Sequence, residues 1–343
     1  MTEPTIVLRA DARPEIGLGH LRRMADLAHA IRARGAGIGL ACADDTRPAA
    51  LSIGWPEGEL IAADPGGAWA AGTDADLIVT DLNWHGGAPA AAAEIAALTA
   101  AGRRVAVIDA VPPDHFTALP DSVPPALVVT PYLGARRLRP APRAARWEAG
   151  AHLAILGTAY ATLRPQVSEP LPRRVLVSCG GSDPTGLAPR IARSLAPTGL
   201  AIDLVVGPLA SVSPELSRLA AAHPNLRLLP PQPGLAQAIL AAGVVVGRLG
   251  LLRYEAAALG RSGIYLHEST AYRPYLDRFA AAGLAEIHYS DPPLGDGPFL
   301  DRLARLGTDP ADFALNRAAL AAVDGQGARN VVDLLLTLTG PAP

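Results

Sequence analysis

Residues 5–23 of the chain have the sequence TIVLRADARPEIGLGHLRR, and this stretch indicates the fold class. The apolar, β-branched run from Thr5 to Asp11 predicts a buried strand, and Gly17 and Gly19 allow a tight turn after it. Apolar residues then recur at helical spacing from His20 to Arg34, which predicts a helix. A strand, a glycine-rich turn and a helix form the repeating unit of parallel α/β proteins.

The same unit recurs along the whole chain. We expect further strands at 76–80, 105–109, 128–132, 175–179, 202–206, 226–229, 244–247 and 263–267, with helices between them. A proline-rich, charged segment near Leu163 to Arg173 separates the two halves. The sequence therefore predicts two Rossmann-like domains, residues 1–166 and 167–343, each with a parallel sheet, and a ligand cleft between them.

The composition excludes several classes of protein. With 343 residues, 50% of them hydrophobic, and a formal net charge of −2, the chain can form two cores and has no basic run for nucleic acid. Cys42 and Cys179 are too few for a disulfide framework, which favours a reducing compartment. The chain start lacks a signal-peptide pattern, and prolines and glycines interrupt the longest uncharged window, 228–247. We therefore expect a cytoplasmic protein without stable membrane insertion.

The first glycine-rich turn ends at His20, where a helix begins. The positive end of the helix dipole disfavours a charged imidazole there, and a neutral imidazole can act as a general base. Asp11, at the end of the preceding strand, is the carboxylate that we expect to orient the ring. The alternative is a histidine that only fills or caps the start of the helix.

A second glycine-rich loop, Cys179 to Gly186, follows an apolar strand and contains Gly180, Gly181 and Ser182. Glycines let a ligand approach the backbone, and the next helix offers unpaired N–H groups to an anion. The spacing matches neither the Walker nor the Rossmann phosphate motif. Asp183 would repel phosphate unless it faces away or caps the helix. An ordinary turn is the alternative.

A third loop runs from Gly247 to Glu255, again between a strand and a helix. Its glycines and Arg248 suit a diphosphate, and Glu255 could accept hydrogen bonds from both hydroxyls of a ribose. The alternative is that Arg248 and Glu255 pair with each other on the surface, which contributes little to stability.

These loops belong to a series of motifs that resembles one enzyme family along nearly the whole chain. The motifs are Arg9-x-Asp11, Ile16-Gly17-x-Gly19-His20-x-x-Arg23, Leu156-Gly157-Thr158-x-Tyr160, Leu163-Arg164-Pro165, Gly180-Gly181-Ser182-Asp183-Pro184, Gly250-x-x-x-Tyr254-Glu255 and Glu268-Ser269-Thr270-Ala271. In this order they resemble the UDP-2,4-diacetamido-2,4,6-trideoxy-β-L-altropyranose hydrolase family, PseG, and its relatives in spore-coat polysaccharide biosynthesis.

The resemblance implies an α/β fold of the GT-B type, with two facing Rossmann-like domains and a UDP-sugar bound mainly by the C-terminal one. It implies neither a metal nor another cofactor. The implied reaction is hydrolysis at the anomeric carbon in the biosynthesis of pseudaminic acid or a surface glycan, with His20 as the base that activates water. The loops and the resemblance together single out His20 and Asp11 for catalysis and, for binding, Gly17, Gly19, Arg23, Asn83, Gly180, Gly181, Ser182, Arg248, Gly250, Glu255, His267 and Glu268.

The chain departs from the family pattern at three places. Asn83 replaces a tyrosine two residues after Asp81, and Leu251 and Leu252 replace hydroxyl residues placed for phosphate. Leu266 and His267 replace an Asn-Gln pair, so His267 could take over recognition of the sugar. The alternative is a histidine that packs at the end of a strand.

Two other functions fit the same fold. The segment 246–250 also resembles the Arg-x-Gly loop of MurG, a glycosyltransferase, in which an acceptor hydroxyl takes the place of water. The N-terminal half offers no clear acceptor surface, which favours the hydrolase. The lost polar residues would also suit a non-catalytic binder of sugar nucleotides. The sequence leaves the sugar and the oligomeric state open.

Overall fold

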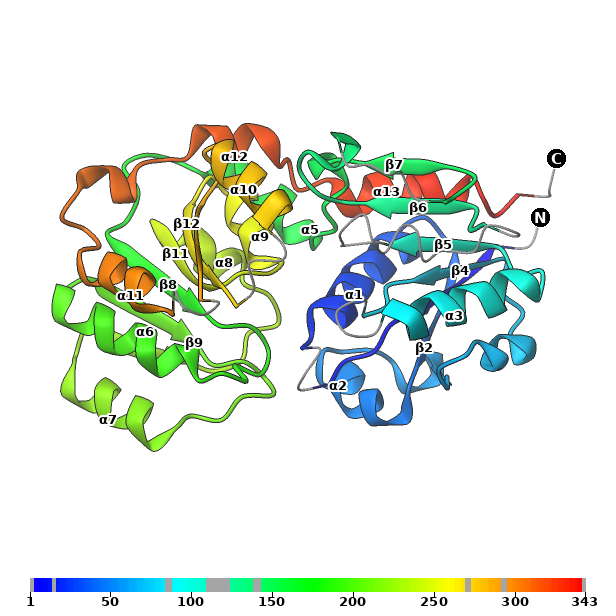
Figure 1. The fold of residues 1–343 in the computed structure, drawn as a ribbon, viewed down its shortest axis with the longest axis horizontal. Helices are drawn as coiled ribbons and strands as arrows, with labels where there is room; N and C mark the ends of the chain where they lie inside the picture. Colours follow the sequence, from blue (N-terminus) through cyan, green and yellow to red (C-terminus); the bar gives the residue numbers. More distant parts are fainter. Residues whose placement is uncertain are drawn as a thin grey trace. The chain divides into compact units, whose positions relative to one another are not determined.

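A computed structural model describes residues 3–13, 17–83, 88–108, 124–137, 143–268, 273–290 and 295–340. The chain forms two compact units, which are described separately. The first unit contains Met1–Thr158 and Gln326–Pro343, and the second contains Ala159–Gly325. Figure 1 shows both units, with labels on many of their helices and strands.

The first unit is built on a parallel sheet, which has seven strands in the described residues, in the order β3-β2-β1-β4-β5-β6-β7. Its strands are β1 (Thr5–Arg9), β2 (Gly37–Cys42), β3 (Leu60–Ala62), β4 (Leu77–Thr80), β5 (Val105–Ile108), β6 (Leu127–Thr130) and β7 (Trp147–Ala149). The α-helices in the part of this unit that the structure describes are α1 (Gly19–Arg32), α2 (Arg47–Ser52), α3 (Ala88–Ala100) and α13 (Gly327–Leu336). Strands β4, β5 and β6 are buried along their whole length, as expected for a parallel sheet covered on both faces.

The second unit has a parallel sheet of six strands in its described part, in the order β10-β9-β8-β11-β12-β13. Its strands are β8 (Arg174–Ser178), β9 (Ala201–Val205), β10 (Leu226–Leu229), β11 (Val244–Arg248), β12 (Ser262–His267) and β13 (Glu286–Tyr289). Its helices are α5, which begins at the boundary (Thr158–Leu163), α6 (Leu187–Leu195), α7 (Pro214–Ala222), α8 (Ala236–Leu240), α9 (Leu252–Ala258), α10 (Arg273–Ala281), α11 (Gly297–Ala304) and α12 (Arg317–Ala322).

The division of the chain differs from the expected one. The sequence suggests a boundary between residues 166 and 167, with the C-terminal tail in the second domain. In the structure, the N-terminal part of the first unit ends at Thr158, and the tail Gln326–Pro343 also belongs to this first unit. The reason is the apolar stripe of α13. Its residues Val331, Val332 and Leu335 are fully buried in the same core as Leu21 and Met24 of α1. In Figure 1, α13 is the red helix among the elements of the first unit.

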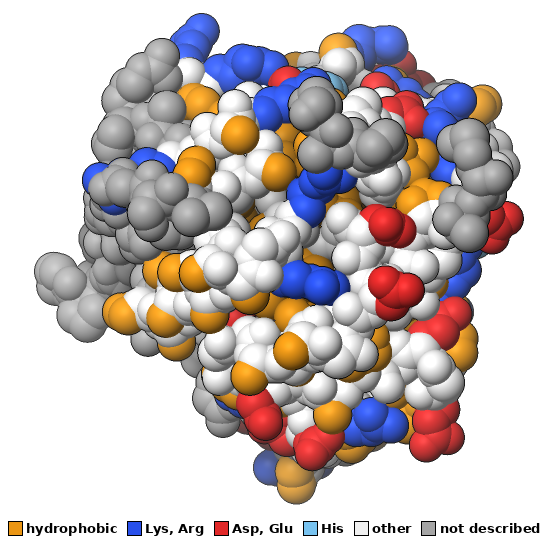
Figure 2. All heavy atoms as spheres, turned by 90° about the vertical axis from the view of Figure 1, so that its right-hand side faces the viewer, with side chains coloured by type: hydrophobic (Ala, Val, Ile, Leu, Met, Phe, Trp, Pro, Cys, Tyr) orange, Lys and Arg blue, Asp and Glu red, His pale blue; other side chains and the backbone are white. Residues whose placement is uncertain are grey.

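No helix in the described ranges has both the length and the apolar character needed to cross a membrane. The molecular face drawn in Figure 2 carries arginine and acidic side chains interspersed with apolar ones.

Candidate functional site

A cluster of charged side chains lies in the first unit where β1 and β4 end. The two strands are neighbours in the sheet, with Arg9 opposite Thr80, so Asp81 emerges beside the loop that leads into α1. His20 is the second residue of α1. Its Nδ1 lies 2.7 Å from Oδ1 of Asp81. The side chain of His20 is 13% exposed and that of Asp81 only 1%.

The pairing with Asp81 fixes the tautomer of His20. An ionised carboxylate can only accept hydrogen bonds, so Nδ1 of the imidazole carries the proton and donates it to Asp81. Nη2 of Arg23 also lies 3.1 Å from Nδ1 of His20. Because a protonated Nδ1 cannot accept a hydrogen bond, these two nitrogens are neighbours that both donate to Asp81. In a neutral ring, the proton-accepting nitrogen is then Nε2.

Arg23 holds Asp81 in its ionised form. Its Nε donates to Oδ2 of Asp81 at 2.8 Å and its Nη2 donates to Oδ1 at 2.7 Å. Its Nη1 donates to the hydroxyl of Tyr132 at 2.7 Å. Burial raises the pKa of Asp81, but the charge of Arg23 and the hydrogen bonds with His20 outweigh it and hold that pKa below its usual value.

Asp11 does not occupy the position that we expect from the sequence. Its Oδ1 lies 2.7 Å from Nη1 of Arg9 and accepts a hydrogen bond from the backbone N–H of Ala43 at 2.8 Å. The buried Arg9 also donates to Glu94 at 2.7 Å, so it lies between two carboxylates. Asp11, two residues beyond the end of β1, therefore pairs with Arg9, and the carboxylate that orients His20 is Asp81. Asp81 and Tyr132 are not among the site residues expected from the sequence.

The turn before His20 adopts the expected glycine conformation. Gly17 has a φ of +79°, which few other residues adopt, and its N–H donates to the carbonyl of Arg13 at 2.7 Å. Gly19 begins α1, and Asn83 lies half-buried two residues after Asp81. Ile16 of this motif lies outside the described residues.

In the second unit, Asp183 caps the helix that follows the Gly180–Ser182 loop. Its carboxylate accepts hydrogen bonds from the N–H groups of Leu187 at 2.8 Å and Ala188 at 3.0 Å. These N–H groups at the start of α6 are therefore not available to an anion. If this loop contacts a phosphate, we expect the contact to come from the backbone and hydroxyl of the Gly180–Ser182 segment.

A cavity of about 270 Å³ adjoins this loop. Gly180, Ser182 and Asp183 line one part of it, and residues of the loop after β9, Gly207 among them, line another. The two loops are packed tightly, because a Cβ at Gly207 would lie 2.3 Å from the carbonyl oxygens of both Gly180 and Gly181. The small residue at 207 thus allows the loop to adopt its position.

Arg248 and Glu255 do not pair with each other. Nη2 of Arg248, the last residue of β11, donates to Oε2 of Glu268 at 2.8 Å. Glu255, in the first turn of α9, accepts a hydrogen bond from the hydroxyl of Tyr160 at 2.5 Å. Tyr160 is buried in α5 and is part of the motif series, but its spacing from Glu255 in the sequence does not indicate this contact.

The remaining predicted residues lie near the same end of the second sheet. An ideal Cβ on Gly250 would meet no atom within 4 Å, so the backbone is open there. His267 ends β12, and its ring makes an edge contact with Tyr289, with 6.4 Å between the ring centroids. Ser269, Thr270 and Ala271 of the last motif lie outside the described residues.

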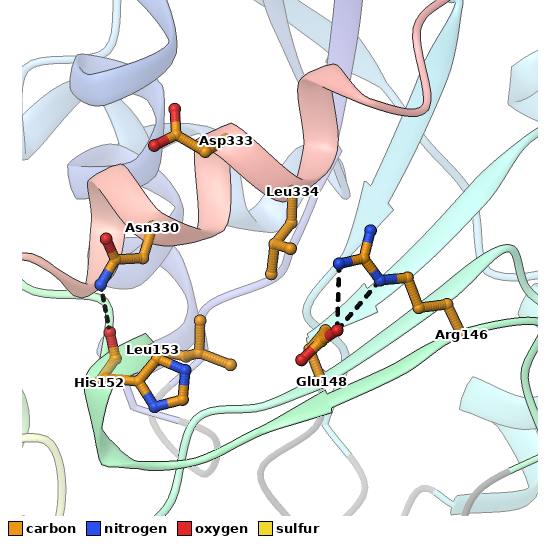
Figure 3. A pocket seen from close by; sticks show the side chains of 7 residues that line it. All are labelled: Arg146, Glu148, His152, Leu153, Asn330, Asp333 and Leu334. Atoms are coloured by element: carbon orange, nitrogen blue, oxygen red, sulfur yellow. Dashed lines mark hydrogen bonds and ion pairs between the residues drawn. The ribbon is translucent and has the colours of Figure 1, made fainter.

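A second cavity, of about 250 Å³, lies in the first unit and contains none of the predicted site residues (Figure 3). Within it, Arg146 pairs with Glu148, and the Asn330 amide donates to the carbonyl of His152 at 2.8 Å. The described part of the chain contains no group of three His, Cys, Asp or Glu side chains arranged to hold a metal ion.

The fold is that of several solved sugar-nucleotide enzymes. No family model and no curated protein matches the chain. MurG of Acinetobacter baumannii aligns with a TM-score of 0.64 and 14% identity, covering 97% of this chain and 99% of its own. UDP-GlcNAc 2-epimerase of Neisseria meningitidis, bound to UDP-GlcNAc, has a TM-score of 0.65 and 12% identity, with 97% and 100% covered. The spinosyn rhamnosyltransferase SpnG, in complex with thymidine diphosphate, has a TM-score of 0.64 and 18% identity, with 98% and 100% covered. Together with the two parallel sheets, these similarities establish an α/β fold of the GT-B type.

Proposed function

We propose that this protein is an enzyme that moves a sugar from a nucleoside diphosphate to a hydroxyl nucleophile, with His20 as the general base. The observation that carries the proposal is the 2.7 Å hydrogen bond between His20 and Asp81. It leaves Nε2 as the accepting nitrogen and provides a buried carboxylate that stabilises the imidazolium once a proton has been taken.

The proposed reaction is a single displacement. Nε2 of His20 takes the proton of the nucleophile's hydroxyl, and the hydroxyl oxygen forms a bond to the anomeric carbon. The bond between that carbon and the diphosphate oxygen breaks, and the nucleoside diphosphate leaves with the electron pair. The same scheme describes transfer when the hydroxyl belongs to an acceptor and hydrolysis when it belongs to water.

In this proposal the second unit supplies the groups that bind the nucleotide. Glu255 would accept hydrogen bonds from the ribose hydroxyls, and the diphosphate would contact Arg248 and the backbone around Gly181 and Gly250. Two of the structural neighbours support a pyrimidine nucleotide, since the epimerase structure contains UDP-GlcNAc and the SpnG structure contains thymidine diphosphate. His267 remains the candidate for contact with the sugar.

Transfer to an acceptor is the first candidate reaction, because MurG and the spinosyn rhamnosyltransferase SpnG have the same fold over nearly their whole length. Hydrolysis is the second. The specific observation that favours it is the ordered motif series from Arg9 to Glu268, which resembles the UDP-sugar hydrolase family.

The test is to incubate the protein with UDP- and dTDP-sugars and to follow free nucleotide and free sugar by NMR, with and without a panel of sugar and lipid-linked acceptors. Nucleotide release that requires an acceptor supports transfer, and release with free sugar in its absence supports hydrolysis. Binding without turnover would indicate a sugar-nucleotide binder. A protein that neither binds nor converts any nucleotide of the panel would contradict the proposal.

A further inference from the structure

Arg248, the arginine expected to contact the diphosphate, forms an ion pair with a carboxylate. Its Nη2 donates to Oε2 of Glu268 at 2.8 Å. The other oxygen of Glu268, Oε1, accepts a hydrogen bond from the hydroxyl of Thr185 at 3.1 Å. The carboxylate of Glu268 thereby joins the loop after β8, the last residue of β11 and the loop after β12.

The surroundings of this pair differ from those of the other arginine–carboxylate pair in the proposed machinery. The side chains of Arg248 and Glu268 are 35% and 36% exposed, whereas Asp81, which pairs with Arg23, is 1% exposed. An ion pair open to water can exchange partners at little cost, whereas removal of one partner from a buried pair leaves an unpaired charge. The Arg248–Glu268 pair is therefore suited to open.

We propose that Glu268 is an internal competitor for the anion site, so that its carboxylate holds Arg248 in the free protein and a nucleotide diphosphate displaces it. This inference rests on the proposed function, because it takes the ligand of Arg248 to be a diphosphate. Glu268 then lowers the apparent affinity for nucleotide instead of contributing to it. On release of the nucleotide, the carboxylate returns to Arg248.

The size of the effect follows from the exposure of the pair. The apparent dissociation constant is the intrinsic one divided by the fraction of protein in which Arg248 is free to bind. Since an exposed ion pair contributes little net free energy, loss of the carboxylate should tighten binding by roughly 2- to 5-fold. The gain should be largest at low ionic strength and should shrink in high salt, which screens exposed charges.

The test is calorimetric titration of the full chain with UDP and with uridine, for the wild type, Glu268→Gln and Glu268→Ala. We expect both variants to bind UDP about 2- to 5-fold more tightly, with uridine affinity unchanged because uridine has no phosphate to meet Arg248. Glu215→Gln is the matched control, since Glu215 forms an exposed pair with Arg193 in the same unit. Arg248→Ala should weaken UDP binding and remove the effect of Glu268→Gln.

A second measurement does not require nucleotide. The reaction of Arg248 with phenylglyoxal, followed by peptide mass mapping, should be faster in Glu268→Gln than in the wild type. Weaker or unchanged UDP binding in both Glu268 variants would overturn the inference, as would unchanged reactivity of Arg248. If Arg248 becomes more reactive but no variant binds UDP, the ion pair is as described and the proposed nucleotide function is what fails.

Discussion

Nδ1 of His20 lies 2.7 Å from Oδ1 of Asp81, although the two residues are 61 positions apart in the sequence. The contact forms because β1 and β4 are neighbours in the sheet, which places the end of β4 beside the start of α1. Arg23, one turn further along α1, binds both oxygens of the same carboxylate. The three side chains thus form one hydrogen-bonded cluster, in which Arg23 orients Asp81 and Asp81 orients His20.

Asp81→Asn should lower turnover by about 10²- to 10⁴-fold, because an amide can donate to Nδ1 and so favour the tautomer in which Nε2 carries the proton. Nucleotide affinity should stay within about 2-fold of the wild type, since the proposed nucleotide groups lie in the second unit. Steady-state kinetics and UDP titration check this, with the exposed His29→Ala on the same helix as the control. Full activity in a folded Asp81→Asn protein would show that the carboxylate has no part in catalysis.

The acidity of Asp26 predicts how stability depends on pH. Burial raises the pKa of this α1 carboxyl to about 6, against the opposing effects of Arg22 and the N–H of Gly157. Its contribution to stability is therefore complete below about pH 4, the ordinary pKa, and is lost as pH rises through about 6. At about 1.4 kcal/mol for each tenfold change in proton affinity, the loss is on the order of 3 kcal/mol.

Asp26→Asn should remove this loss, since a neutral amide can still accept from Gly157. Urea denaturation at pH 4.5, 6 and 8 should show that the free energy of unfolding of the variant increases relative to that of the wild type as pH rises. Asp81 has the opposite effect, because its lowered pKa stabilises the fold above about pH 4 and this stabilisation is lost in acid. Both proteins contain Asp81, so its contribution cancels when the variant and the wild type are compared at the same pH. A difference between the two proteins that does not change with pH would contradict the assignment to Asp26.

Two glycines of the second unit should respond differently to alanine. Gly207→Ala should destabilise the protein by roughly 1–3 kcal/mol, because its Cβ would lie 2.3 Å from two backbone oxygens. Gly250→Ala should leave stability unchanged, since its Cβ meets nothing within 4 Å, but should weaken UDP binding where the ligand approaches the backbone. Thermal unfolding and calorimetry separate the two effects. Wild-type UDP affinity in Gly250→Ala would place the diphosphate elsewhere.

Tyr160→Phe should reduce the preference for UDP over 2′-deoxy-UDP. The Tyr160 hydroxyl donates to Glu255 at 2.5 Å, and without it the carboxylate is less firmly oriented for the ribose. We expect a loss of about 2- to 5-fold in UDP affinity. The change removes one hydrogen bond from a neutral hydroxyl to a charged carboxylate, and water replaces part of that hydrogen bond. In a double-mutant cycle, the change should have no further effect once Glu255→Ala is present, because alanine leaves no acceptor for the Tyr160 hydroxyl. Additive effects would mean that Tyr160 does not act through Glu255.

Some strands could be predicted closely and others could not. β10 lies at the expected residues, and β8 and β11 within one residue of them, because apolar runs between turn signals mark buried strands. β2 has the sequence GIGLAC, and its glycines disfavour the prediction of a strand. β13 has the sequence EIHY and lies at the edge of its sheet, so its polar residues also do not indicate a strand. An amphipathic helix such as α13 shows that it has an apolar face but not which core that face joins.

The same distinction applies to the site. The sequence predicts which loops follow strands, so it places His20 and Arg248 at the ends of elements. It does not give the order of strands in the sheet, and that order brings Asp81 to His20 and leaves Asp11 with Arg9. Similarly, the partners of Arg248 and Glu255 depend on neighbouring loops in space, which local spacing does not specify.

In the proposed function, His20 acts as the base in sugar transfer from a nucleoside diphosphate. The most direct test is ³¹P NMR measurement of nucleotide release from a converted UDP- or dTDP-sugar by the wild type and by His20→Ala under identical conditions. We expect release by the wild type and a rate lower by about 10²- to 10⁴-fold in the variant, with both proteins folded. Equal rates of release from the two proteins would contradict it.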